Sequence, residues 1–426
     1  MKRIAVIGTG ISGMAIARLL HRQHDITVFE AASRPGGHTH TVEVHQDQPQ
    51  GHQSWPVDTG FIVFNHRTYP AFTRMIEALG VKSRASDMSF SVRDDQRDLE
   101  YLGGHLSGLF AQKRNLVRPA FWRMIREIIR FYGEARELLA EDCSEGLAPL
   151  GPWLRRRGYS RFFIDEHLIP MAASIWSAPP KAIIAFPARF FVRFLANHGM
   201  IDLRDRPRWR TVCGGSQAYL KALIAPFQDR IRCATPIHSV AHISAGVRLL
   251  GKQVDEIFDE VVIAAHADQA LSMRYAGGDL DRDEEETLKA FPYQANMAWL
   301  HTDTRFLPRR QQAWAAWNYY RAPGGSQRPV TLTYNLNILQ GHVADQQFLV
   351  TLNPHRPIDR RQVLRRIQYA HPLYTQHSPQ AQSRHKSISG RGGIHYCGAY
   401  WGYGFHEDGL QSALRVARHM GLEETW

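Results

Sequence analysis

A glycine-rich turn near the N-terminus, set between two short apolar runs, is the feature that most constrains the fold of this chain. Residues 3–7 form one apolar run, and residues 8–13 follow at once with the pattern Gly-x-Gly-x-x-Gly. An apolar stripe over 15–20 predicts a helix, and alternation over 26–29 predicts a second strand. A strand, a glycine turn, a helix and a strand within thirty residues are typical of a dinucleotide-binding domain.

Each part of the turn has its own physical reason. Gly8 permits the sharp turn, Gly10 lets the backbone approach a pyrophosphate, and Gly13 allows the helix to pack closely on the strand. The first N–H groups of the helix, at Ile11 and Ser12, are free to bind phosphate oxygens. A glycine turn in an unrelated α/β domain is the alternative, and NAD and FAD are not distinguished by this unit.

Residues after the second strand bear on the choice of cofactor. Glu30 ends that strand and is placed to accept hydrogen bonds from ribose hydroxyls. The segment 31–39 adds an arginine and a glycine pair that could cradle a pyrophosphate, and 57–61 places a glycine beside an aromatic. Taken alone, either segment is also compatible with an ordinary loop. The candidate cofactor contacts here are Ala31, Arg34, Gly36, Gly37, His38, Thr39, Thr59, Gly60 and Phe61.

With these segments the chain resembles the flavin-containing amine oxidase and phytoene desaturase superfamily. There, Arg-x-Gly-Gly follows the ribose-binding acid and Asp-x-Gly passes near the flavin ring. The double glycine of 213–220, the pair of segments 231–237 and 260–265, and the turn within 395–413 resemble later parts of that family. The resemblance implies FAD, held without a covalent bond, paired strands at the adenine, and further contacts at Ile237, Gly398, Ala399, Gly409, Leu410 and Ala413.

The likeness is nearest to a bacterial subgroup of FAD-dependent oxidoreductases, whose genes often lie beside those for cyclopropane fatty acid synthesis. It covers essentially the whole chain. The motifs that carry it do not reveal the subgroup's substrate. They are residues 173–177, 197–199, 316–319 and 404–409.

Two departures from the amine oxidases concern catalysis. Their substrate-domain lysine is missing from the comparable stretch 294–300, and the position of their aromatic over the flavin falls at His406. Both departures disfavour a plain amine as substrate. His406 is the candidate catalytic acid or base because imidazole titrates near neutrality, and a backbone hydrogen bond at the turn is the alternative. The expected substrate-pocket residues are Trp176, Tyr400, Trp401 and Tyr403, and packing of the turn is the alternative for the last three.

The fold class that follows is α/β, with a Rossmann-type, glutathione-reductase-like FAD domain interleaved with an α+β substrate domain. Alternation predicts strands in the substrate domain at 330–335 and 348–352, and the polar segment 376–389 is interpreted as a surface linker. The FAD domain is expected at 1–70, 206–268 and 386–426, and the substrate domain at 71–205 and 269–385.

Charge and composition bear on partners. Lys and Arg number 52 against 40 Asp and Glu, which gives +12 and favours acidic partners. Segment 105–140 is a predicted basic amphipathic helix, suited to an anionic membrane surface or to a solvated face over a buried stripe. Segment 168–195 is apolar enough to wall a substrate cavity or to fill a core. The four cysteines, Cys143, Cys213, Cys233 and Cys397, lie far apart and favour a reducing compartment.

No run of 18 apolar residues and no cleavage-type leader is found, so a cytoplasmic protein is expected. Peripheral contact at the inner membrane face is a further expectation. Histidine spacing gives no metal site, and no nucleic-acid-binding module accompanies the positive charge.

The resulting hypothesis is an FAD-dependent oxidoreductase that dehydrogenates an apolar, lipid-like (fatty-acyl) substrate by hydride transfer to flavin N5. The alternatives are a flavin amine oxidase that oxidises a C–N bond with O2, and an FAD-binding accessory protein to a lipid-modifying enzyme. The sequence names neither the substrate, nor the electron acceptor, nor the oligomeric state.

Overall fold

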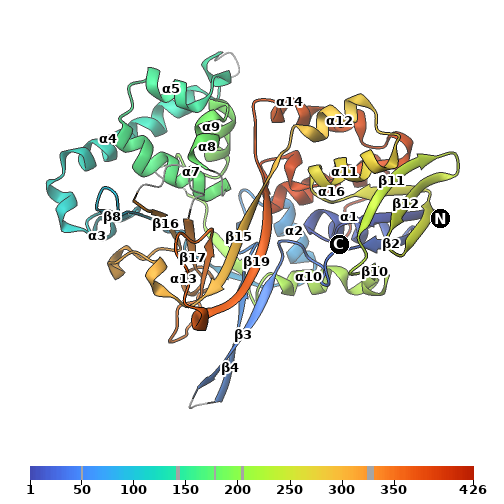
Figure 1. Ribbon diagram of the computed structural model, residues 1–426, viewed down its shortest axis with the longest axis horizontal. Coiled ribbons are helices and arrows are strands. Elements are labelled where there is room, and N and C mark those ends of the chain that lie inside the picture. The colour runs from blue at the N-terminus through green and yellow to red at the C-terminus, as the bar shows by residue number, and fades with distance from the viewer. Residues whose placement is uncertain (49–50, 141–143, 177–178, 203–205, 324–330) are drawn as a thin grey trace.

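The computed structural model describes residues 1–426 apart from 49–50, 141–143, 177–178, 203–205 and 324–330. Cys143, Ser177 and Val330, which belong to the predictions above, therefore lie outside the described residues. The chain forms two halves joined by long central strands, and both termini lie in the same half (Figure 1).

A parallel sheet is the centre of the half that holds the termini. Its strand order is β10-β2-β1-β14-β20, and its strands come from the three segments expected for a cofactor domain. Strand β1 is buried along nearly its whole length, because both faces of the sheet are covered. The strands are β1 (Arg3–Ile7), β2 (Asp25–Phe29), β10 (Ile231–Arg232), β14 (Glu260–Ile263) and β20 (Ile394–Tyr396).

The expected pairing of segment 231–237 with segment 260–265 is wrong. Strand β10 pairs with β2, and β14 pairs with β1 and β20, so two strands separate these segments. Ile237 starts a strand in a different, antiparallel sheet. Sequence proximity of two apolar runs does not reveal which neighbours each strand takes.

Helices cover one face of the parallel sheet and a small antiparallel sheet covers the other. On the first face the apolar residues of α1, α2, α10 and α16 form one core; on the second, β11-β12-β13 packs with α11 and α12. The bounds are α1 (Ile11–Leu20), α2 (Pro70–Ala78), α10 (Gln217–Ile224), α16 (His406–His419), β11 (Ile237–Ile243), β12 (Gly246–Gly251), β13 (Val254–Phe258), α11 (Ala267–Gly277) and α12 (Arg282–Lys289).

A seven-stranded sheet organises the second half, in the order β19-β15-β18-β17-β16-β7-β8. Its pairs are antiparallel except for β16 with β7. The long strands β15 and β19 run between the two halves (Figure 1). Strands β17 and β18 lie where alternation predicted them. The bounds are β7 (Phe90–Asp94), β8 (Leu99–Leu102), β15 (Tyr293–His301), β16 (Trp317–Arg321), β17 (Thr331–Asn335), β18 (Leu349–Leu352) and β19 (Val363–Pro372).

Helices pack over the β7–β8 end of this sheet and bury a large apolar core with it. The single helix expected over 105–140 is instead α3, a 3-10 turn at Lys113–Val117, and α4, which begins at Pro119. Proline disfavours helical backbone at the residue before it but suits the first helical position, which explains the break. The helices are α3 (Leu106–Leu109), α4 (Pro119–Glu137), α5 (Leu150–Arg156), α6 (Arg161–Phe163), α7 (Ile169–Trp176), α8 (Pro180–Ala185) and α9 (Ala188–Asn197).

Two smaller sheets connect the halves. The hairpin β3–β4 extends away from the body (Figure 1), and its apolar residues near the body share a core with β15 and β18. Strand β9 lies between β5 and β6. The bounds are β3 (Thr41–Gln48), β4 (Gly51–Asp58), β5 (Val63–Asn65), β6 (Ser83–Ala85), β9 (Trp209–Val212) and α13 (Leu336–Gln340).

The interpretation of 376–389 as a surface linker is wrong. The segment forms α14 (Ser378–Ser383) and α15 (His385–Ile388), and Ala381 and Ile388 are buried in the core that also holds β14. The segment is polar in composition, but one residue in each helical turn is buried. Within the described ranges, no helix is long and apolar enough to cross a membrane.

Candidate functional site

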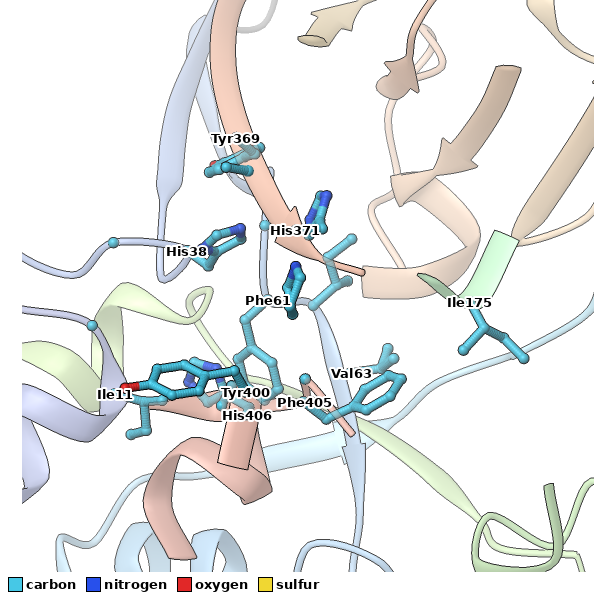
Figure 2. Close-up of a pocket in the computed structure, with 18 of the residues that line it drawn as sticks. Ile11, His38, Phe61, Val63, Ile175, Tyr369, His371, Tyr400, Phe405 and His406 are labelled. Carbon is cyan, nitrogen blue, oxygen red and sulfur yellow. The ribbon is translucent and has the colours of Figure 1, made fainter. Parts of the chain in front are cut away.

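One cavity of about 1620 Å³ runs through both halves of the molecule. It begins at the glycine turn after β1, passes between β19 and the start of α16, and continues to α7 and α4. Figure 2 shows its central part, with Ile11 toward one end and Ile175 toward the other. A single space of this length can hold an extended cofactor and a second molecule in line with it.

The glycine turn opens toward this cavity as the sequence predicts. Gly8 has a φ of +101°, which favours glycine, and its N–H donates to Phe29 O at 2.8 Å. A Cβ on Gly13 would lie 1.9 Å from the Gly8 carbonyl oxygen, so this glycine is required for packing and does not reach the cavity. A Cβ on Gly10 would meet no protein atom within 4 Å, so the space in front of Gly10 is open.

Helix α1 begins at this opening without an anionic or capping partner of its own. Gly10 provides no side-chain cap, and the first turn contains no acidic residue. Ile11 and Ser12 line the cavity. A helix N-terminus with unsatisfied N–H groups and its positive dipole end fits a phosphate, and this is the observation that fits the chain to a dinucleotide.

Glu30 lies at the predicted place, beyond the end of β2. Its carboxylate accepts hydrogen bonds from Thr9 N at 3.0 Å and from Ala32 N at 2.8 Å, and both Glu30 and Ala31 line the cavity. The Thr9 hydroxyl also donates to Oε2, the oxygen that accepts from Thr9 N, so the lone pair left for a ribose hydroxyl is on Oε1.

Arg34 lines the cavity, but its described hydrogen bonds go to the loop that contains it. It donates to the carbonyls of Pro35, Gly37 and Thr39 at 2.9–3.2 Å, and burial lowers the pKa of its guanidinium. Arg34 therefore shapes the loop in which Gly37 lies against Gly10.

Several predicted cofactor contacts lie behind the residues that line the cavity. A Cβ on Gly409 would lie 2.8 Å from Ile11 Cγ2, because α16 packs closely on α1 there. The hydroxyl of Thr39 bonds to Tyr219, and that of Thr59 bonds to Tyr369 at 2.9 Å. Of the predicted cofactor residues, those that are not among the described lining of the cavity are Gly13, Gly36, Thr39, Thr59, Gly409, Leu410 and Ala413. Those that line it are Gly8, Gly10, Ile11, Ser12, Glu30, Ala31, Arg34, Gly37, His38, Gly60, Phe61, Ile237, Gly398 and Ala399.

His406 lies in the middle of the cavity wall, but its environment corrects the reason for choosing it. Its ring stacks on Phe61 at a centroid distance of 3.7 Å, and its Nε2 hydrogen-bonds to the Tyr219 hydroxyl at 2.5 Å. Burial lowers the pKa of His406 to about 3. The imidazole is therefore neutral at physiological pH and does not titrate near neutrality, contrary to the expectation.

Of the four residues expected in the substrate pocket, Tyr400 lines the cavity (Figure 2). Three others are corrected, since the described lining does not include them. Trp176 packs among Phe186, Phe191 and Phe194, Trp401 packs on Phe291 and His385, and Tyr403 packs on Phe190. The part of the cavity that lies in the second half is instead lined by apolar side chains including Val63, Met88, Phe90, Leu109, Ile125, Ile128, Ile129, Met171, Ile175, Phe194, Met200 and Phe405.

A cluster of rings lies opposite His406, and the sequence predicted His38 of this cluster but missed its members on β19. His38 stacks on Tyr369 at 4.7 Å and lies 5.3 Å from His371, both on β19. His38 Nε2 is buried without a described partner. Figure 2 shows His38 and His371 on one side of the cavity, with Tyr400 and His406 on the other. Alternation over Ile367, Tyr369 and His371 could have indicated that β19 presents these residues to one face.

Comparisons with known proteins agree with this architecture. A Mycobacterium tuberculosis protein named as a flavin-containing monoamine oxidase, AofH, is 24% identical over 278 residues in each of two strains. The match covers 61% of this chain, and this chain spans 56% of the length of those relatives.

Solved structures show the same fold at low identity. A putrescine oxidase bound to putrescine is 15% identical with a TM-score of 0.66, and covers 98% of both chains. A CLA-producing fatty acid isomerase from P. acnes is 16% identical with a TM-score of 0.63, again over 98% of both chains. At these identities the likeness concerns the fold alone.

The sequence profile of the flavin containing amine oxidoreductases matches residues 11–334, about three quarters of the chain. FAD is the cofactor of that family, and the open helix N-terminus and Glu30 fit it. The chain belongs to the flavin containing amine oxidoreductase family.

Proposed function

We propose that this protein is an FAD-dependent oxidoreductase that dehydrogenates an apolar, lipid-like acyl substrate and converts a C–C single bond to a double bond. The observation that carries the proposal is the continuity of the cavity. Its first part has the glycine turn, the open α1 N-terminus and Glu30, and its second part has an apolar wall from α4, α7 and α9. The proposed cofactor and substrate therefore share one continuous space.

FAD, when bound, would supply the acceptor for a hydride from one substrate C–H bond, and the two electrons would pass on to an acceptor such as O2. The proton lost by the neighbouring carbon would reach solvent where the cavity opens at Ile129. The residues of this chain bind and orient the substrate and exclude water from it. Val63, Ile175 and Phe405 would hold an acyl chain against the central part of the cavity, where Phe61 and His406 stack (Figure 2). Burial of the apolar chain supplies the binding free energy, at about 0.8 kcal/mol per CH2 group.

The described lining holds the carboxylates of Glu30, Asp87 and Asp268 and two arginines, one of which offers a partner for a substrate acid. The permanent cations are Arg34 and Arg206, and Arg206 lies beside Tyr132 in the second half. An acyl carboxylate would be attracted to Arg206, whereas an ammonium group would be repelled.

Anaerobic mixing of the FAD-loaded protein with saturated and unsaturated fatty acids or acyl esters tests the proposal. We expect the visible flavin band to bleach and mass spectrometry to show a product that has lost two hydrogens. A flavin that stays oxidised with every acyl and amine donor would refute this activity and favour the accessory role.

Amine oxidation is a second candidate, favoured by Asp87. Its carboxylate lines the cavity in the segment before β7, and a carboxylate is the group that would bind a substrate ammonium. Bleaching by amines, with hydrogen peroxide formed on admitting air, would select this candidate. Asp87→Asn would then raise KM for the amine, and it would leave acyl oxidation unchanged.

We also propose that the face formed by α3, the 113–117 turn and α4 contacts an anionic membrane and admits the substrate. Leu106 is 73% exposed, Val117 80% and Ile129 55%, and Leu116 and Trp122 are also exposed. Ile129 lines the cavity as well, so the cavity reaches this face. Basic side chains surround these apolar ones, a pattern typical of interfacial helices. They are Lys113, Arg114, Arg118, Arg123, Arg126 and Arg130.

Vesicle flotation with phosphatidylglycerol and with phosphatidylcholine tests the membrane contact. Val117→Asp should reduce binding to anionic vesicles. Val343→Asp is the matched control, because Val343 is 92% exposed outside this face and should tolerate the change. Equal flotation of both variants with the parent protein would refute the assignment of this face.

A further inference from the structure

Three strands of the second half place a chain of amide and imidazole groups beneath the cavity wall. Asn353 directly follows β18, Asn296 is fully buried in β15, and His371 faces the cavity from β19. Asn296 lies within the stretch 294–300, where the related amine oxidases were expected to carry a lysine. The proposed function makes no use of this chain of groups.

The hydrogen bonds of the chain run in one direction. The Met297 N–H donates to Asn353 Oδ1 at 3.1 Å, so the amide oxygen of Asn353 is fixed by a backbone donor. Its Nδ2 then donates to Asn296 Oδ1 at 2.7 Å. That leaves Asn296 Nδ2 facing His371 Nδ1 at 2.8 Å.

An amide NH2 can only donate, so His371 Nδ1 must be the ring nitrogen without a proton. The proton of the neutral ring is then on Nε2. In a doubly protonated ring Nδ1 would also carry a proton, so two hydrogen-bond donors would face each other at Asn296 Nδ2. Burial also lowers the pKa of His371 to about 4, with the nearby His266 acting in the same direction.

We infer that the Asn353–Asn296–His371 chain locks His371 as a neutral imidazole with its Nε2–H directed into the cavity, where it donates a hydrogen bond to the ring system of the bound flavin. This inference rests on the proposed function for its flavin arm. His371 faces His38 and lies across the cavity from Tyr400 and His406, at the centre of the space that continues from the nucleotide end (Figure 2). In this role Asn296 and Asn353 are positioning residues.

The first arm of the test concerns the tautomer and needs no bound flavin. Two-bond ¹H–¹⁵N spectra of the histidine rings distinguish the tautomers, and His371→Gln identifies the His371 signals by their loss. We expect the Nε2–H pattern in the full chain. Asn296→Asp replaces the donor by an acceptor, so it should convert His371 to the Nδ1–H or the doubly protonated form. Gln346→Glu adds the same charge at an exposed position before β18, away from the ladder that holds His371, and should leave the His371 pattern unchanged.

The second arm concerns the flavin. His371→Phe should shift the visible absorption band of bound FAD and slow flavin reduction by roughly 100-fold, in the range found for loss of one preorganised donor. His371→Gln keeps an N–H donor and should restore part of both. An Nδ1–H pattern in the parent protein overturns the locked tautomer. An unshifted flavin band and unchanged reduction rate in His371→Phe overturn the donor role, even where the tautomer holds. Absence of any flavin reduction by acyl or amine donors in the parent protein would count against the proposed function. This inference would then be decided by the tautomer of His371 and by the absorption band of bound FAD.

Discussion

Substituting alanine for Gly10 should affect stability and cofactor affinity in opposite directions. Gly10 has a φ of −62° and a ψ of 177°, which alanine adopts without strain, and its added Cβ would meet no protein atom within 4 Å. Reduced freedom of the unfolded chain should therefore raise the free energy of unfolding of the FAD-free protein by about 0.4–1 kcal/mol.

The same methyl group would occupy the space through which a pyrophosphate reaches the backbone at the start of α1. Loss of one charge-assisted hydrogen bond costs about 1.5–3 kcal/mol. This corresponds to an FAD Kd weaker by roughly 10- to 150-fold. Quenching of flavin fluorescence on titration measures the Kd, and denaturant unfolding without FAD measures the stability.

Gly13→Ala is the contrasting variant, because its Cβ would lie 1.9 Å from the Gly8 carbonyl oxygen. It should lower the free energy of unfolding with or without FAD, by roughly 1–3 kcal/mol from overpacking. A Gly10→Ala protein that binds FAD with unchanged affinity would refute the placement of the pyrophosphate. One that is less stable than the parent without FAD would refute the open space in front of Gly10.

Three further outcomes are expected. Glu30→Ala should weaken FAD binding by roughly tenfold or more through loss of the ribose contact, and unchanged retention of FAD on desalting would contradict that role. His406→Phe should leave the pH profile of flavin reduction unchanged between about pH 5 and pH 9, because burial lowers the pKa of His406 to about 3; an ionisation near neutrality that disappears in this variant would show the burial argument to be wrong. Burial raises the pKa of Asp58 to about 7, above its unfolded value of about 3.9. This carboxyl group therefore loses its proton at lower pH in the unfolded chain, and the free energy of unfolding should fall as the pH rises from about 4 to 7. Asp58→Asn should remove this part of the pH dependence in denaturant unfolding, and an identical slope in both proteins would refute it.

Local sequence was enough to predict the nucleotide-binding unit. Gly8 needs a positive φ, Gly13 needs a missing Cβ, and Glu30 follows a strand, and all three requirements arise within thirty residues. The β-branched and alternating residues likewise placed β17 and β18, although the structure buries these strands on both faces. The broad fold class followed from these elements and from the resemblance of the later motifs.

Predictions that depended on distant neighbours were less successful. The segment containing Ala381 and Ile388 has a polar composition, and only the core around β14 explains why it forms helices. Trp401 is aromatic and close in sequence to the cavity residue Tyr400, but it turns toward Phe291 and away from the cavity. Side-chain direction at such a turn depends on which element packs against it.

The sequence by itself determined that this chain has a dinucleotide-binding turn, an acid after its second strand and an α/β fold. The tertiary structure alone decided the protonation of its histidines. His406 is neutral because Phe61 and Tyr219, far away in sequence, enclose it. The direction of the hydrogen bonds that reach His371 follows from strands β15, β18 and β19 lying together. Proton affinity depends on the solvation and the hydrogen-bond partners of a group, and these exist only once distant segments have packed.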